Sequence, residues 1–133
     1  MRRAYKLLII EDNEELRTLF GGFFERKHYD TVFAANGMEG LELLENKEHR
    51  FDLVITDIVL PHISGLGIIS ILKKKYPDIP VIAITGWGEQ PLSLASEVKA
   101  DRVMAKPFEL KTLENQIIDL ILQKHSELDS QAL

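Results

Sequence analysis

The chain has 133 residues, 45% of them hydrophobic, a formal net charge of −5 and no cysteine. This length fits one domain with a buried core, and the apolar content excludes an intrinsically disordered chain. Without cysteine, the chain has no disulfide, zinc–thiolate site or thiol nucleophile. The negative charge argues against non-specific nucleic-acid binding as the main function, and we expect no direct nucleic-acid partner.

The first apolar stretch, residues 7–10, is too short for the core of a secretion signal. No apolar run approaches the ~20 residues that a membrane-spanning helix needs. The sequence therefore predicts a cytoplasmic protein with no membrane partner.

Five short apolar runs, most of them rich in β-branched residues, predict five buried strands, at residues 7–10, 31–34, 53–56, 81–84 and 102–105. Apolar residues at helical spacing between and after these runs predict five helices, at residues 16–24, 38–45, 66–72, 92–98 and 110–121. Asp12 or Asn13 caps the first helix. The third helix ends before Pro77, because a proline disfavours the helical conformation of the preceding residue. The last helix is expected to fade into a polar tail at residues 126–133.

Regular alternation of strands and helices predicts a doubly wound α/β fold with a parallel sheet and helices on both faces. The sequence shows no linker, internal repeat or second domain. We therefore expect a single domain over residues 1–133, with a core at about residues 6–122.

A polar residue follows four of the five predicted strands. Glu11 and Asp12 come after the first strand, and Asp57 comes after the third. Thr85 follows the fourth strand, and Lys106 follows the fifth. Ligands of parallel α/β sheets bind beyond the carboxyl ends of the strands, so these side chains should meet in one pocket. Three carboxylates, a hydroxyl and an amine in one pocket are typical of phosphoryl transfer.

The chemistry of this pocket indicates a metal-assisted reaction. Crowded carboxylates are unfavourable without a cation, and Mg²⁺ suits a few carboxylates together with water and phosphate oxygens. An aspartate such as Asp57 can act as a nucleophile and form an acyl phosphate. Lys106 and Thr85 would supply a positive charge and a hydrogen-bond donor to the phosphoryl oxygens. Each residue alone has a plainer explanation as a cap, turn or surface residue, so the prediction depends on the joint pattern.

These residues resemble the receiver domain of two-component response regulators over about residues 6–122. The stretches that carry the resemblance are residues 7–13, residues 55–61 with Gly65, residues 83–86 and residues 106–108. The resemblance implies a flavodoxin-like fold with strand order 2-1-3-4-5. It implies a phosphorelay function, in which Asp57 accepts a phosphoryl group from a sensor histidine kinase or a histidine phosphotransfer protein. Such a domain is not an enzyme, since it catalyses only its own phosphorylation and dephosphorylation.

The resemblance also implies a ligand set and an output surface. Asp12, Asp57 and the backbone carbonyl of Val59 would hold Mg²⁺, with Glu11 acting directly or through water. Thr85 and Lys106 would contact the phosphoryl oxygens, and the bond from Lys106 to its proline would be cis. A downstream protein would bind the face formed by the fourth helix, the fifth strand and the fifth helix.

Two positions depart from the family pattern. Val103 stands where the family has an aromatic residue that couples phosphorylation to the output surface. Glu11 replaces the more common aspartate and keeps the carboxylate on a longer side chain. As a further hypothesis, Trp87 and Val59 shield the acyl phosphate from water.

Two other functions remain open. A haloacid dehalogenase-like phosphatase also forms an aspartyl phosphate, but it uses a second aspartate two residues after the nucleophile, where this chain has Val59. A phosphorylation-independent scaffold would keep the fold without the chemistry, and Val103 leaves this alternative open.

Overall fold

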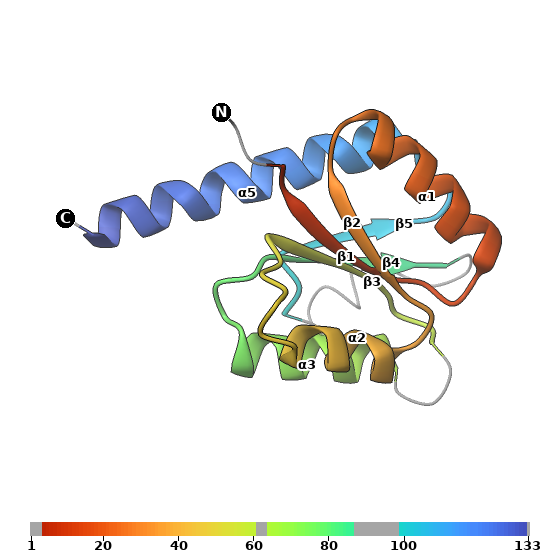
Figure 1. The fold of residues 1–133 in the computed structure, drawn as a ribbon, viewed down its shortest axis with the longest axis horizontal. Coiled ribbons are helices and arrows are strands. Elements are labelled where there is room, and N and C mark those ends of the chain that lie inside the picture. The colour runs from red at the N-terminus through yellow and green to blue at the C-terminus, as the bar shows by residue number, and fades with distance from the viewer. Residues whose placement is uncertain (1–3, 61–63, 87–98, 133) are drawn as a thin grey trace.

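A five-stranded parallel sheet forms the centre of the computed structural model, which describes residues 4–60, 64–86 and 99–132. The strands are β1 (Lys6–Ile10), β2 (Asp30–Ala34), β3 (Leu53–Asp57), β4 (Val81–Thr85) and β5 (Arg102–Ala105). They lie in the order β2-β1-β3-β4-β5 (Figure 1). The predicted flavodoxin-like fold and strand order are therefore confirmed, and each predicted strand is correct to within one residue at either end.

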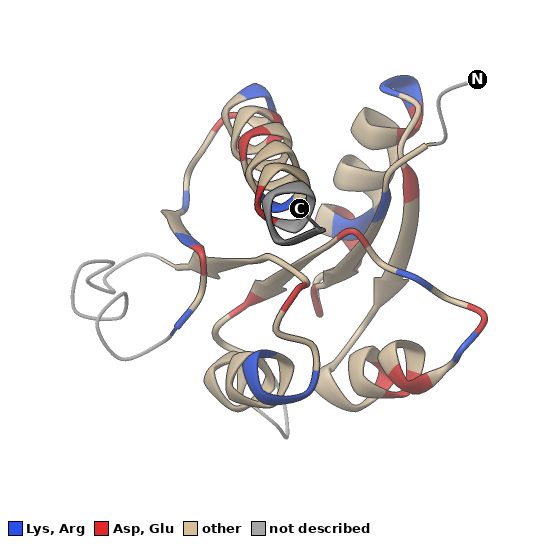
Figure 2. Cartoon of the chain, turned by 90° about the vertical axis from the view of Figure 1, so that its left-hand side faces the viewer, with Lys and Arg blue, Asp and Glu red and all other residues tan. Residues whose placement is uncertain are grey.

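Helices cover both faces of the sheet. They are α1 (Glu14–Arg26), α2 (Gly37–Glu45), α3 (Gly65–Lys75) and α5 (Leu110–Ala132). α1 and α5 lie on one face, and α2 and α3 lie on the other (Figures 1 and 2). Leu7 and Ile9 of β1 join the buried cluster on the α1 and α5 side, whereas Leu8 and Ile10 join the cluster on the α2 and α3 side. Because both faces of the central strands β1, β3 and β4 are buried, their sequences are nearly continuous apolar runs.

The described part of the chain contains four helices. The helix expected at residues 92–98 lies outside the described residues. None of the described helices has the length and apolar character to cross a membrane.

The predicted fading of the last helix at residue 126 is wrong. α5 continues as a helix to Ala132 and projects past the sheet (Figure 1). The segment from residue 122 to residue 132 contains no glycine or proline and is rich in residues with good helix propensity. The prediction relied on apolar spacing, which ends where the helix leaves the core.

The C-terminal end of α1 closes without a glycine. His28 adopts a left-handed conformation with φ of 65°. Its N–H donates to the carbonyl oxygen of Glu25, and the Tyr29 N–H donates to that of Phe24, both at 3.0 Å. The rings of Phe24 and Tyr29 pack edge to face at 5.4 Å. This pattern is a Schellman motif, in which glycine is the usual residue at the left-handed position.

The register of the sheet brings the strand ends together. Ile10 of β1 pairs with Thr56 of β3. The next residue of each segment is therefore at the same level, which puts Glu11 beside Asp57. The carboxyl ends of all five strands lie at one edge of the sheet, as parallel pairing requires (Figure 1).

Candidate functional site

Asp57 is the last residue of β3, and its carboxylate is almost buried. One carboxylate oxygen, Oδ1, accepts a hydrogen bond from the Val59 N–H at 3.2 Å. The other, Oδ2, lies 2.9 Å from the Lys106 Nζ. Lys106 follows β5, so its side chain reaches past the end of β4 to form this ion pair. The structure thus joins the two residues that were predicted to accept the phosphoryl group and to neutralise its charge.

Glu11 is a buried carboxylate that lacks a full set of partners. Its side chain is 2% exposed, and its Oε2 accepts the Asn13 N–H at 3.2 Å. Its Oε1 is buried without a hydrogen bond and lies 3.5 Å from the Lys106 Nζ. Burial raises the pKa of Glu11 to about 7, against the opposing effect of the Asn13 N–H. The Asp57 and Asp12 carboxylates raise this pKa as well.

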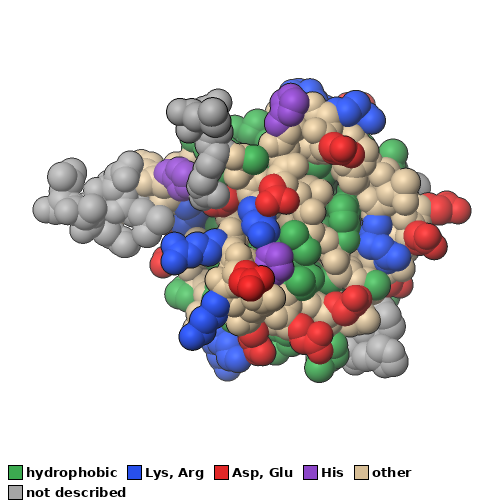
Figure 3. Space-filling model, in the orientation of Figure 1, with side chains coloured by type: hydrophobic (Ala, Val, Ile, Leu, Met, Phe, Trp, Pro, Cys, Tyr) green, Lys and Arg blue, Asp and Glu red, His purple; other side chains and the backbone are tan. Residues whose placement is uncertain are grey.

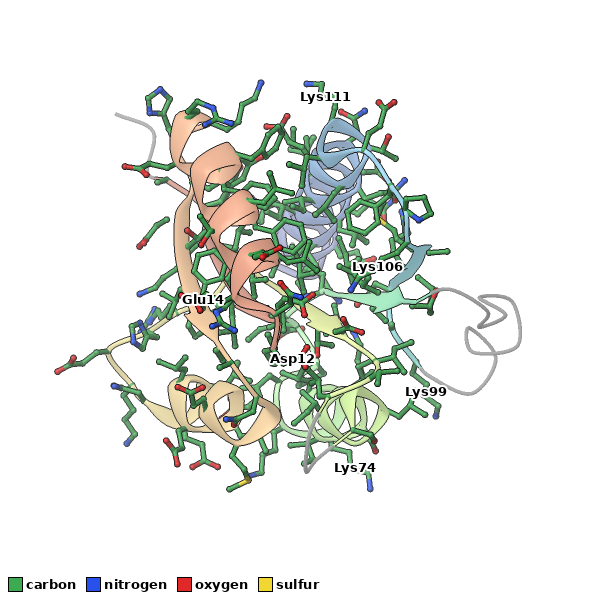
Figure 4. The ribbon with its side chains drawn as sticks, turned by 90° about the vertical axis from the view of Figure 1, so that its right-hand side faces the viewer. Asp12, Glu14, Lys74, Lys99, Lys106 and Lys111 are labelled. Carbon is green, nitrogen blue, oxygen red and sulfur yellow. The ribbon has the colours of Figure 1, made fainter. Side chains whose placement is uncertain are left out.

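The three predicted acidic residues converge at this edge. Glu11, Asp12 and Asp57 each offer one oxygen, and the three oxygens lie within 4.8 Å of one another. Asp12 is exposed, and it lies with Lys106 at the edge where the strands end (Figure 4). Oxygen ligands in this number suit a hard divalent cation that retains water, which describes Mg²⁺. The unsatisfied Glu11 oxygen and the close carboxylates therefore fit the predicted metal.

Lys106 offsets part of this negative charge. Burial by itself would lower the pKa of Lys106, but the carboxylates of Asp57 and Glu11 outweigh burial and raise it. These residues line an open, polar cavity of about 610 Å³ with the start of α1. The cavity is large enough to admit a phosphoryl group together with a hydrated cation.

The loop between β1 and α1 is held by two interactions. Asn13 caps α1, because its Oδ1 accepts the Leu16 N–H at 3.0 Å. This resolves the choice between Asp12 and Asn13 and leaves the Asp12 carboxylate in the acidic cluster. The Arg17 guanidinium donates to the backbone carbonyl of Glu11 at 2.8 Å. Arg17 was not among the predicted site residues. The sequence marks it only as a basic residue near the start of a helix that begins with acidic residues.

Thr85 lies at the same edge of the sheet. It is the last residue of β4, is fully buried and pairs with Ala105 of β5. Its hydroxyl donates to the Met104 carbonyl oxygen at 3.5 Å, which is long for a hydrogen bond. The hydroxyl is therefore directed toward β5 and is only weakly held there.

The remaining predicted residues have different outcomes. The peptide bond between Lys106 and Pro107 is cis, as expected. Val103 is half-buried and packs against the cluster on the α2 and α3 side. The side chain of Val59 is 62% exposed, and the role expected for its carbonyl stays a prediction. Trp87 lies outside the described residues.

Comparison with known proteins places this arrangement in a family. The sequence matches the response regulator receiver domain over residues 7–118. It is 30% identical over 118 residues to the response regulator receiver protein CpdR of Brucella abortus, covering 88% of this chain and 97% of CpdR. It is 32% identical over 113 residues to sporulation initiation phosphotransferase F of Bacillus subtilis, covering 84% of this chain and 90% of that protein.

A solved structure agrees with this assignment. A response regulator receiver domain protein from Clostridium thermocellum matches with a TM-score of 0.82 at 28% identity, over 91% of this chain and 97% of that one. The chain belongs to the response regulator receiver domain family, whose members act in phosphorelay signalling rather than as conventional enzymes. Other curated relatives are longer, and the chain spans 45% of one and 12% of another.

Proposed function

We propose that Asp57 is the phosphoacceptor of this receiver domain and that it takes its phosphoryl group from a phosphohistidine. The observation that carries this proposal is the ion pair between Lys106 Nζ and Asp57 Oδ2 at 2.9 Å, beside two further carboxylates. An ionised aspartate that is held by a lysine at the edge of an open cavity combines a nucleophile with a charge for the incoming group.

The transfer involves one bond formed and one bond broken. A carboxylate oxygen of Asp57 attacks the phosphorus atom, and the bond from phosphorus to the donor imidazole nitrogen breaks. That nitrogen keeps the electron pair of the broken bond. Lys106 then shifts its contact from the carboxylate to a phosphoryl oxygen. The Thr85 hydroxyl, which is only weakly held by the Met104 carbonyl, turns to donate to a second phosphoryl oxygen.

Mg²⁺ is the cofactor that this site fits. Asp12, Asp57 and the Val59 carbonyl would hold it, with Glu11 acting directly or through water. When bound, the ion supplies positive charge that offsets the three carboxylates and the phosphoryl oxygens. Arg17 supports this role by fixing the Glu11 backbone through its 2.8 Å hydrogen bond.

The donor is proposed to be a sensor histidine kinase or a histidine phosphotransfer protein in the cytoplasm. A mainly apolar groove of about 240 Å³ adjoins Lys106 and is lined by Leu16, Leu19, Phe20, Pro107, Phe108 and Leu110. Leu19 is 54% exposed there. An exposed leucine next to the reacting groups suits a partner that must bring its histidine to Asp57.

The output surface is proposed to include β5 and α5 together with the fourth helix, which lies outside the described residues. Arg102 joins β5 to α5, because it hydrogen-bonds Gln116 at 3.0 Å and forms an ion pair with Asp119 at 2.8 Å. With Val103 in place of an aromatic residue, the transmission of the signal to this surface depends on groups other than a rotating ring.

The test is to incubate the protein with Mg²⁺ and acetyl phosphate and to record its intact mass. We expect the wild type to gain the mass of one phosphoryl group, and the Asp57→Asn variant and a sample with excess EDTA to gain none. A thermal unfolding curve of the variant shows whether it is folded. A folded variant that still gains the mass would exclude Asp57 as the acceptor, and a wild type that gains none with several donors would favour the scaffold function.

A further inference from the structure

The large apolar side chains that are exposed among the described residues fall at two opposite edges of the sheet. Leu19, Met38 and Val59 lie on segments that follow the carboxyl ends of β1, β2 and β3. The proposed docking of the phosphoryl donor at the Asp57 edge accounts for the exposure of these three side chains. Ile118 and Leu122 are 38% and 56% exposed and lie one turn apart on α5. Donor docking does not account for this second pair.

Ile118 and Leu122 border a groove at the amino ends of the strands. This α5 groove has a volume of about 480 Å³ and is lined mainly by Tyr5, Lys27, His28, Tyr29, Ile118 and Leu122. Tyr5 precedes β1 and Tyr29 precedes β2, so the groove is on the side of the sheet away from Asp57. Its lining is more apolar than polar. Lys27 and His28, at the end of α1, add basic groups to its rim.

α5 continues far beyond the residues that bury it. Ile121 is its last side chain in the buried core, and Leu122 to Glu127 are exposed except for the half-buried Lys124. Residues 122–132 nevertheless remain helical and project from the domain (Figure 1). Because these turns extend an already formed helix, they avoid the cost of nucleation, but they leave Leu122 unpacked at 56% exposure. The projecting end of α5 (residues 122–132) is therefore a preformed helical surface that begins at the groove.

The last part of the projecting end is acidic and the rim of the groove is basic, although the first part of the projecting end also carries Lys124, which pairs with Glu127 of the same helix at 3.4 Å. Residues 126–132 include Glu127 and Asp129 and no basic residue. The rim of the groove carries Lys27 and His28, with Arg26 next to them in sequence. Histidine and basic side chains are visible at the top of the molecule, over the end of α1 (Figure 3).

We propose that this chain forms a symmetric dimer in which the projecting end of α5 of each copy lies in the α5 groove of the other. The two α5 helices cross in antiparallel orientation near Leu122, so Ile118 and Leu122 of both copies form the centre of the interface. Each copy offers the same helix and the same groove, which closes a two-fold assembly. Glu127 of one copy then exchanges its contact with Lys124 of its own helix for a contact with Lys27 of the other copy. The phosphoacceptor edge stays free in this dimer, so the proposal does not depend on the function of Asp57.

The mass of the full chain in solution, followed by sedimentation velocity from low micromolar to near millimolar concentration, tests this proposal. We expect a dimer whose association is weakened at least ~30-fold by Leu122→Glu, the size of effect found for residues at the centre of an interface. Leu19→Glu is the matched control, because Leu19 has nearly the same exposure at the opposite edge. Both leucines are exposed, so neither change should unfold the domain, and circular dichroism verifies this.

A charge-exchange pair makes the test specific for the proposed geometry. Glu127→Lys and Lys27→Glu should each weaken the dimer, and the two changes in one chain should restore association. Asp57→Asn should leave the dimer intact. A monomer at every concentration would overturn the proposal and leave the groove to another protein. A dimer that Leu122→Glu leaves unchanged, or that Leu19→Glu disrupts as strongly, would overturn it as well.

Discussion

Replacing Glu11 by glutamine should stabilise the protein in the absence of metal. The side chain is 2% exposed, and its Oε1 has no hydrogen bond. Its neighbours Asp12 and Asp57 are acidic, and Lys106 at 3.5 Å is shared with Asp57. An ionised carboxylate is therefore held in an unfavourable place unless a cation is bound.

The magnitude follows from the pKa. Burial raises the pKa of Glu11 from an ordinary value of 4.5 to about 7. At about 1.36 kcal/mol for each pH unit of difference, the ionised form destabilises the fold by at most about 3 kcal/mol. Between pH 4.5 and about 7 the folded state binds more protons than the unfolded state, so the free energy of unfolding falls as the pH rises through this window. Above that window the full destabilisation is present.

Urea unfolding with excess EDTA, repeated across this pH window, measures the effect. We expect Glu11→Gln to be more stable than the wild type by about 1–3 kcal/mol at weakly alkaline pH, and the difference to shrink as the pH falls. Added Mg²⁺ should raise the stability of the wild type more than that of the variant, because a ligand that binds the folded state stabilises it. Glu42→Gln on the exposed side of α2 is a control that should follow the wild type.

The reasoning would be refuted if wild type and Glu11→Gln lost stability in parallel as the pH rises. Any other titrating group is common to both proteins and cancels in the difference between them. A variant that is less stable than the wild type at alkaline pH would show that the contact with Lys106 outweighs the burial of charge.

Further predictions concern the backbone and are measured by urea unfolding at low protein concentration. Gly65→Ala should destabilise the domain by about 3 kcal/mol, because the new Cβ would lie 2.1 Å from the backbone oxygen of Asp57. Gly22→Ala should instead stabilise it by about 1 kcal/mol, since its Cβ would meet only the flexible end of Arg26 at 3.4 Å. His28→Gly should add about 1 kcal/mol by removing a side chain from a left-handed position. The opposite sign for any of the three would contradict the local geometry on which it rests.

The strand ends were predictable because one physical constraint fixes them. Runs that are buried on both faces must be apolar, so the first polar residue after each run marks the carboxyl edge of the sheet. Parallel pairing then brings Glu11, Asp57, Thr85 and Lys106 to that edge, independently of the conformations of the loops. The distances were not predictable. Lys106 lies 2.9 Å from Asp57 but 3.5 Å from Glu11. This difference depends on side-chain conformations, which the spacing of residues in the sequence does not determine.

Helix ends were harder to predict, because they depend on local hydrogen bonds and on surfaces outside the domain. The end of α1 contains no glycine, so the left-handed His28 had no signal in the sequence. The apolar spacing of α5 ends at Ile121, but the residues after it favour a helix, and α5 continues to Ala132. Apolar spacing reports where a helix is buried within its own domain and says nothing about the turns that follow.

Under the proposed function, Glu11 would also change the response of the site to phosphorylation. With an aspartate at this position, the shorter side chain would draw the carboxylate back toward the end of β1. The longer side chain of Glu11 both accepts the Asn13 N–H and approaches Lys106. Lys106 is therefore shared between Asp57 and Glu11 before any phosphoryl group arrives. If Asp57 is the phosphoacceptor, as proposed, a phosphoryl group there would draw Lys106 away from Glu11 as well, and the Glu11 carboxylate would then depend on a bound cation. Metal binding and phosphorylation should consequently be more tightly coupled here than in a receiver with aspartate at this position.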